Sequence, residues 1–285
     1  MATTAQAGQA QAVPNSTGIE PPKLSAPPNA TDCHIHIYDP HFSPRVEKPT
    51  DATVADYRLL QKRIGVSRVV IVQPRNYATD NSATLDAIAQ FGVDRARGVG
   101  VVRPTVTDAE LKRLNAGGIR GIRFTTGDPH TAIVSPGMIE PLAKRIARYG
   151  WHVQLNMPVE QIVAYASILR SLPTQIVFDH LGKVPDLGHP AYRVIRELID
   201  QRKAWVKVSG AYMYRSYSEA TAIARAYVDA APERCVWGSD WPHPGPAIKP
   251  DDAELFDLLS AWAPDDATRH RILVTNPQAL YGFPK

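Results

Sequence analysis

The chain of 285 residues has only two cysteines, Cys33 and Cys235, too few to hold a fold of this size together by disulfides. We expect both to be reduced, as in a cytoplasmic protein. No run of 18 apolar residues and no signal-peptide pattern is present, so no membrane span or membrane partner is expected. The formal net charge is only +4, without a concentrated basic stripe, which argues against nucleic acid as a partner.

The first thirty residues lack apolar periodicity. They are rich in Ala and Gln and then in Pro. Such a segment buries too little apolar area to offset the entropy lost on ordering. We therefore expect residues 1–30 to be a disordered tail, and residues 31–285 to form a single domain.

From residue 31 onward, short runs rich in β-branched residues alternate with segments of helical periodicity, a pattern that favours parallel βαβ units. Eight strands are predicted, at 31–38, 67–73, 97–102, 119–125, 152–157, 174–180, 204–210 and 234–240. Helices are predicted at 53–64, 80–91, 107–115, 136–149, 159–172, 190–202, 216–230, 251–262 and 265–274.

Two parallel architectures fit this alternation, an open doubly wound sheet and a closed (β/α)8 barrel. No GxGxxG follows the first strand, which weakens the dinucleotide-binding form of the open sheet. Seven of the eight strands end in, or run into, a polar group. A barrel brings all these ends to one rim, where barrel enzymes carry out their chemistry. We therefore predict a single α/β fold of the TIM-barrel type.

The strongest candidate site combines three strands. Asp32, His34 and His36 are expected on one face of the first strand, because side chains alternate along a strand. His180 follows strand six, and Asp240 ends strand eight before a Trp-Pro-His-Pro turn. In a closed barrel the first and last strands are neighbours, so these imidazoles and the carboxylate are expected to face one substrate or ion.

Polar groups at other strand ends are candidates for substrate binding. Arg123 on strand four is suited to a bidentate pair with a substrate carboxylate, the alternative being a buried salt bridge with a neighbouring Asp. The further candidates are Gln73, Arg75, Asn156, Tyr212 and His243. Some residues are expected to have no catalytic part. His152 lies at the start of strand five, on the barrel face where residues serve stability, and Cys33 lacks a neighbouring base. The others are the loop residues His41, His130 and His189.

These motifs resemble those of a known family. HIH at 34–36, DHLG at 179–182 and WGSDWPHP at 237–244 are similar to the amidohydrolase superfamily, in particular to the "amidohydrolase 2" branch, which contains 2-pyrone-4,6-dicarboxylate lactonase and galactarolactone isomerase. The similarity covers nearly all of residues 31–283. It implies a (β/α)8 fold and the hydrolysis of, or rearrangement within, small cyclic esters.

The resemblance also implies roles for the candidate residues. Asp240 is expected to be the general base, and His34, His36 and His180 to bind and polarise a lactone carbonyl. Many amidohydrolases hold divalent ions with such a set, whereas several lactone-acting members are thought to work without one. The expected cofactor is therefore none, or one divalent metal such as Zn²⁺ held by the same four residues.

The chain also departs from the lactonase pattern. Arg123 matches the first of the arginines that hold the pyrone dicarboxylate, but no second arginine follows in 125–130. Asn156 stands where that enzyme has an aromatic residue. These differences argue against the pyrone as substrate and leave the reaction type unchanged.

We therefore predict a hydrolase that opens a small carboxylated lactone, with water as the nucleophile. The alternatives are a lactone isomerase that uses a substrate hydroxyl in place of water, a Zn²⁺-dependent decarboxylase, and a non-catalytic binding protein. The enzyme is expected to act as a monomer or a homo-oligomer on a small anionic lactone.

Overall fold

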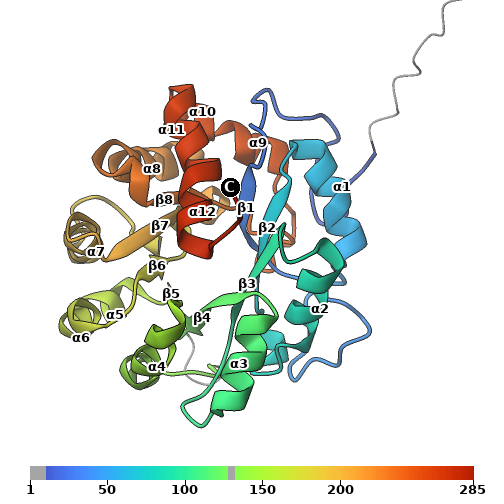
Figure 1. Cartoon of the computed structure of the whole chain (residues 1–285). Coiled ribbons are helices and arrows are strands. Elements are labelled where there is room, and N and C mark those ends of the chain that lie inside the picture. Colours follow the sequence, from blue (N-terminus) through green and yellow to red (C-terminus); the bar gives the residue numbers. More distant parts are fainter. Residues whose placement is uncertain (1–10, 128–131) are drawn as a thin grey trace, which may run out of the picture.

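The computed structural model describes residues 11–127 and 132–285 (Figure 1). Eight strands form one parallel sheet in the order of the sequence. They are β1 Thr31–Ile35, β2 Arg68–Val72, β3 Ala96–Gly100, β4 Ile119–Thr125, β5 His152–Asn156, β6 Ile176–Phe178, β7 Ala204–Val208 and β8 Cys235–Trp237. Each of them overlaps a predicted strand.

The chain just after β8 returns to β1 and brings the two ends of the sheet together. Ile35 forms a parallel bridge with Trp241. The N–H of Asp240 donates to the carbonyl of His34 at 2.9 Å, and the N–H of His36 donates to the carbonyl of Trp241 at 2.8 Å. The predicted barrel is confirmed, and its closing bonds lie beside the candidate site residues.

The helices surround the barrel (Figure 1). They are α1 Val54–Ile64, α2 Ser82–Phe91, α3 Asp108–Ala116, α4 Ile139–Ile146, α5 Val159–Ala164, α6 Ala166–Ser171, α7 Pro190–Asp200, α8 Tyr217–Ala230, α9 Asp252–Asp257, α10 Leu259–Trp262, α11 Asp266–His270 and α12 Asn276–Tyr281. The helix predicted at 159–172 is interrupted at Tyr165, and the one predicted at 251–262 at Leu258. No helix among the described residues is long and apolar enough to cross a membrane.

The first strand departs from regular alternation. The pairing of β1 with β2 shifts register between Asp32 and Ile35. As a result Asp32 points away from the site and accepts a hydrogen bond from Tyr57 Oη of α1 at 2.9 Å, while Cys33 packs among the apolar side chains inside the barrel. The expectation that Asp32 shares a face with His34 and His36 is therefore wrong.

The last residues of the chain close the end of the barrel opposite the site. Arg97 of β3 donates to the carbonyls of Tyr281 and Gly282, and Arg68 of β2 donates to that of Pro284. The Phe283 ring packs against both guanidinium groups, 5.0 Å from that of Arg97. Within the described part of the chain, these contacts cover that end of the barrel.

Residues 11–30 have no helix or strand, yet they pack against the barrel. Val13 is buried, and the Trp241 indole donates to the carbonyl of Pro14 at 2.8 Å. The N–H groups of Lys23 and Leu24 donate to the Asp257 carboxylate. In this part of residues 1–30, where a disordered tail was expected, backbone and polar contacts take the place of the missing apolar periodicity. Residues 1–10 lie outside the described part of the chain.

A stability prediction follows from Gly238, where the end of β8 meets β1. A Cβ atom at this position would lie 2.7 Å from His34 Cβ and 2.9 Å from the His34 backbone nitrogen. We expect Gly238→Ala to lower the free energy of unfolding by about 1–3 kcal/mol, because backbone atoms must move to make room. The matched control is Gly137→Ala, whose Cβ would meet nothing nearer than 4.0 Å. Denaturant unfolding measures both, and equal midpoints for the two variants would contradict the packing described.

Candidate active site

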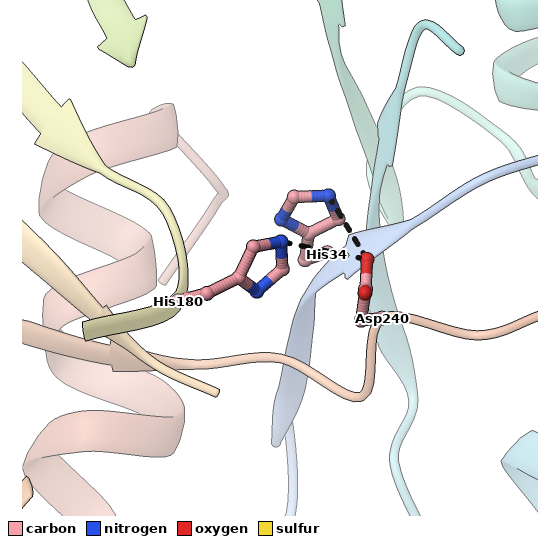
Figure 2. Close-up of side chains that lie close together, drawn as sticks. All are labelled: His34, His180 and Asp240. Atoms are coloured by element: carbon pink, nitrogen blue, oxygen red, sulfur yellow. Dashed lines mark ion pairs between the residues drawn. The ribbon is translucent and has the colours of Figure 1, made fainter. Parts of the chain in front are cut away.

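Four side chains from three regions of the barrel meet at its open rim. Figure 2 shows three of them, His34, His180 and Asp240. Oδ1 of Asp240 lies 3.4 Å from His34 Nε2, 3.6 Å from His36 Nε2 and 3.7 Å from His180 Nε2. All four side chains are nearly fully buried. The structure thus brings together the three imidazoles and the carboxylate that were singled out in the sequence.

Hydrogen bonds on the far sides of the imidazoles fix their orientation. Nδ1 of His36 lies 2.7 Å from the carbonyl of Val72, which only accepts, so Nδ1 holds the proton and Nε2 of the neutral ring is an acceptor. Nε2 of His34 lies 3.4 Å from that acceptor, and Nδ1 of His34 lies 3.2 Å from Lys207 Nζ, which only donates; both contacts favour a proton on His34 Nε2. Nδ1 of His180 lies 3.0 Å from Ser209 Oγ.

Asp240 is held by its backbone and by one neighbour. Its φ of 67° lies in the left-handed region, which Asp tolerates better than most residues, and the N–H of His243 donates to its carbonyl. The phenol of Tyr212 donates to Oδ2. Oδ1 accepts no hydrogen bond from the described residues, and this buried oxygen faces the imidazoles.

Asp179 connects the imidazoles to the cationic groups behind them. Its Oδ2 accepts from Arg123 Nε at 3.0 Å and from Gln154 Nε2 at 3.2 Å. Its Oδ1 lies 3.3 Å from His34 Nδ1 and 3.5 Å from Lys207 Nζ. Lys207 Nζ also donates to the carbonyl of Cys33 and lies 3.2 Å from His34 Nδ1. The salt bridge considered for Arg123 is therefore present.

Asp179 and Lys207 were not among the predicted site residues. Asp179 immediately precedes His180, and Lys207 is the one charged residue in the strand sequence AWVKV. A lysine within a strand buried on both faces was the available signal, because such a charge requires a partner.

Burial controls the protonation of the imidazoles. It lowers the pKa of His36 to about 4, with the nearby Arg123 charge acting in the same direction. Burial also lowers the pKa of His180, and burial together with Lys207 lowers the pKa of His34 well below its ordinary value. All three rings are therefore neutral at pH 7.

The two carboxylates behave differently from the imidazoles. Burial alone would raise the pKa of Asp240, but the three imidazoles and the Tyr212 hydrogen bond together lower it below its ordinary value. Burial would also raise the pKa of Asp179, but this pKa is lowered well below its ordinary value by His34, Lys207 and Arg123. Both carboxylates are therefore ionised at neutral pH.

A cavity of about 710 Å³ opens onto Asp240, His36 and His180. Four cationic side chains contribute to its walls, against only two acidic ones. The cations are Lys48, Arg75, Arg123 and Lys183. Lys48 and Lys183 were not predicted, since one belongs to a long loop and the other to a turn that follows His180. The excess of positive charge suits an anionic ligand.

Arg75, Arg123 and Asn156 line this cavity as expected. Asn156 Oδ1 is buried and has no hydrogen-bond donor among the described residues. It is a polar atom that a ligand hydroxyl can satisfy.

Three predicted substrate-binding residues do not line this cavity. Gln73 is fully buried and donates to the carbonyl of Asp80, so it fixes the chain that follows β2. Tyr212 binds Asp240, and His243 lies behind Tyr212 with Nε2 at 3.2 Å from Asp252. Gln73 and Tyr212 use their polar atoms within the protein, whereas the buried Nδ1 of His243 has no hydrogen-bond partner among the described residues. Substrate contact by these three residues stays a prediction.

The residues expected to be inactive are also placed. Both cysteines are free and buried, and burial raises the pKa of each thiol. His152 is buried, while His41 is exposed beside Asp39. The ring of His189 accepts a hydrogen bond from the N–H of Ala191 at the start of α7. His130 lies outside the described residues.

The imidazoles and the carboxylate also fit a divalent metal. Ligand atoms of His34, His180 and Asp240 lie within 4.8 Å of one another, and Oδ1 of Asp240 has no donor among the described residues. Two nitrogens and one carboxylate oxygen are a donor set that Zn²⁺ accepts in catalytic sites. His36, which was expected as a fourth ligand, lies outside this set.

Comparison with known proteins identifies the family. The amidohydrolase family model (Amidohydro_2) matches residues 31–283. The chain belongs to the amidohydrolase family. It is an enzyme of the amidohydrolase superfamily, as the motifs at 34–36, 179–182 and 237–244 indicated.

Similar proteins include lactone hydrolases and a lactone isomerase. A 4-sulfomuconolactone hydrolase from Rhizobium radiobacter is 32% identical, with 92% of this chain and 93% of the relative covered. A 2-pyrone-4,6-dicarboxylate hydrolase from Comamonas testosteroni is 31% identical, covering 91% and 92%. A D-galactarolactone isomerase from Agrobacterium fabrum is 32% identical, covering 91% and 93%.

The buried imidazoles predict acid sensitivity. Because the folded-state pKa of His36 is about 4 and the ordinary value is 6.5, the unfolded chain binds more protons between these pH values. The free energy of unfolding is therefore expected to fall as the pH drops from 6.5 to 4, by about 3 kcal/mol for His36 alone. His152, with a pKa of about 3, adds to this loss. Asp32, with its pKa raised to about 6 by burial, partly offsets it.

Denaturant unfolding between pH 4 and pH 8, with a chelator present, measures this dependence. His36→Gln is the informative variant, because glutamine does not titrate. We expect a shallower decline in that variant than in the parent protein. A parent stability that does not change between pH 4 and pH 6.5 would contradict neutral, buried imidazoles.

Proposed function

We propose that this enzyme hydrolyses a small carboxylated lactone. The observation that supports this most is the buried, ionised Asp240, whose free oxygen faces three neutral imidazoles at the wall of a cation-lined cavity. A carboxylate next to a bound water is suited to act as a general base. The similarity to enzymes named for lactone hydrolysis supports the same reaction.

In the proposed mechanism Asp240 accepts a proton from the water that attacks the lactone carbonyl carbon. The Nε2–H of His34 donates to the carbonyl oxygen, where negative charge develops in the tetrahedral intermediate. Lys207 favours this tautomer, because its ammonium donates to His34 Nδ1. When the intermediate collapses, the ring C–O bond breaks and the departing alkoxide takes the proton from Asp240. The product is the open-chain hydroxy acid.

A divalent ion held by His34, His180 and Asp240 would supply Lewis-acid polarisation of the carbonyl and a more acidic water. His34 would then bind the ion instead of donating its Nε2–H, whereas three other groups keep their tasks in either case. Tyr212 orients Asp240, and His36 is fixed by the Val72 carbonyl. Arg123, braced by Asp179, is placed to bind a substrate carboxylate.

A lactone isomerase is the second candidate, favoured by the similarity to D-galactarolactone isomerase. In that reaction a hydroxyl of the substrate attacks the carbonyl in place of water. The deciding experiment offers mono- and dicarboxylated sugar lactones in ¹⁸O-labelled water, with and without chelator, and analyses the products by mass spectrometry. We expect one ¹⁸O atom in the product carboxylate. An isomeric lactone without label would overturn hydrolysis and support the isomerase.

Removing the base should abolish most turnover. We expect Asp240→Asn to lower kcat by about 10²–10⁴-fold, because the amide cannot accept the proton from water. Tyr212→Phe keeps the carboxylate and loses only its hydrogen bond, so we expect a smaller fall of about tenfold. Steady-state kinetics tests both, with circular dichroism to verify folding. Near-normal kcat in Asp240→Asn would remove Asp240 from the mechanism.

The cations of the cavity should determine affinity for the acid group. We expect Lys183→Met to raise KM for a carboxylated lactone by about tenfold, since one charge-assisted contact is lost. The methyl ester of the same lactone should show little difference between parent and variant. The control is Lys112→Met, at an exposed position of α3. An equal loss for acid and ester would show that Lys183 does not recognise the anion.

A further inference from the structure

The segment before β1 reaches the loops that surround the active site. In Figure 1 the dark-blue chain that precedes β1 runs beside α1. Residues 13–18, which we call the strap, make side-chain and backbone hydrogen bonds to two loops that are far apart in the sequence. One loop joins β1 to α1, and the other joins β8 to α9.

The strap contacts the β8–α9 loop at both of its ends. The indole of Trp241, the residue after Asp240, donates to the carbonyl of Pro14 at 2.8 Å. At the other end the N–H of Thr17 donates to the carbonyl of Pro250 at 3.0 Å. The strap therefore spans most of the loop that contains the proposed general base, Asp240.

Asn15 links the strap to the β1–α1 loop. Its Nδ2 donates to the carbonyl of Asp51 at 3.1 Å, and its Oδ1 accepts from Thr50 Oγ1 at 3.2 Å. Its φ of 60° is in the left-handed region, where Asn is among the favoured residues. Val13, at the start of the strap, is buried and anchors this end.

Arg63 of α1 fastens the other end of the strap. Its Nη1 donates to the carbonyl of Thr17 at 2.9 Å, and its Nη2 pairs with Asp251 Oδ1 at 2.6 Å. Gly18 packs so closely on this pair that a Cβ atom would lie 2.0 Å from Asp251 Oδ2. A larger residue at this position would therefore have to displace the Asp251 carboxylate from its pair with Arg63.

Both loops contribute to the wall of the active-site cavity. Glu47, Lys48 and Pro49 come from the β1–α1 loop, and Pro244 and Gly245 come from the β8–α9 loop. Neither wall segment lies in a strand or helix, so other contacts must fix their separation. The strap is bonded to both loops within a few residues of these wall positions.

We propose that residues 13–18 are a positioning element of the active site, which holds the two loops at the spacing that the lactone requires. The kinetic part of this inference rests on the proposed lactone hydrolysis. Asp240 and the imidazoles are held by the barrel and by their own neighbours. Loosening the strap is therefore expected to weaken substrate binding more than the chemical step.

Two variants loosen the strap in different ways. Asn15→Gly keeps the left-handed backbone and removes only the bonds to Thr50 and Asp51. Gly18→Ala introduces the clash with Asp251. Its matched control is Gly150→Ala, since Gly150 has a φ of 67° against 69° for Gly18, yet its Cβ would meet nothing within 4 Å. Both alanine variants thus have the same backbone strain.

The first measurement is hydrogen exchange, which needs no substrate. We expect faster exchange in 39–53 and 241–251 for both strap variants, and unchanged exchange there for Gly150→Ala. Unchanged exchange in the strap variants would overturn the proposal, whatever the enzyme turns over. If the strap variants show faster exchange but the parent enzyme opens no lactone, the result would count against the proposed function alone.

The second measurement separates the effect of the strap variants on KM from their effect on kcat. We expect KM for the lactone to rise by about three- to tenfold in the strap variants, the effect of a lost polar contact or two, with kcat changed by less than about twofold. Gly150→Ala should match the parent enzyme in both constants. Loss of stability without a change in KM would show that the strap is structural only, and would overturn the positioning role.

Discussion

The hydrogen bond from the Asp240 N–H to the His34 carbonyl, at 2.9 Å, is the constraint on which the site depends. It lies where the end of β8 meets β1, so the contact that closes the barrel also sets the separation of the carboxylate and the first imidazole. Gly238 allows this approach, because any larger residue would collide with His34. The contacts that close the barrel are therefore also the contacts that place Asp240 next to His34.

A second constraint is electrostatic. Lys207 and Asp179 are fully buried, and charges are retained in such surroundings only when they are paired and hydrogen-bonded. Asp179 meets that condition by contacting Arg123 with one oxygen and approaching His34 and Lys207 with the other. In the proposed mechanism the same carboxylate therefore braces both Arg123, which is assigned to the substrate carboxylate, and His34, which is assigned to the lactone carbonyl. Removing the Asp179 carboxylate is therefore expected to disturb substrate binding and the chemical step together.

Much of the fold was predictable from the sequence, since eight apolar runs alternate with helical segments and the polar ends of the runs indicate a common rim. His34, His36, His180 and Asp240 were predictable because closure makes the first and last strands neighbours. The positions of Asp32 and Cys33 were not, because a register shift in β1 breaks the alternation on which the prediction rested. Nor could spacing reveal that Gln73 and Tyr212 use their polar atoms within the protein, or that Nε2 of His243 lies against Asp252. The strap was missed because its stability comes from polar contacts with distant loops, which leave no periodic pattern in the chain.

The most direct test is a crystal structure of Asp240→Asn with an intact carboxylated lactone bound. We expect the lactone carbonyl oxygen within hydrogen-bond distance of His34 Nε2, the amide of residue 240 beside the face of the carbonyl carbon, and the substrate carboxylate at Arg123. A lactone bound with its carbonyl turned away from the imidazoles, or with its carboxylate far from Arg123, would contradict the proposed chemistry of this site.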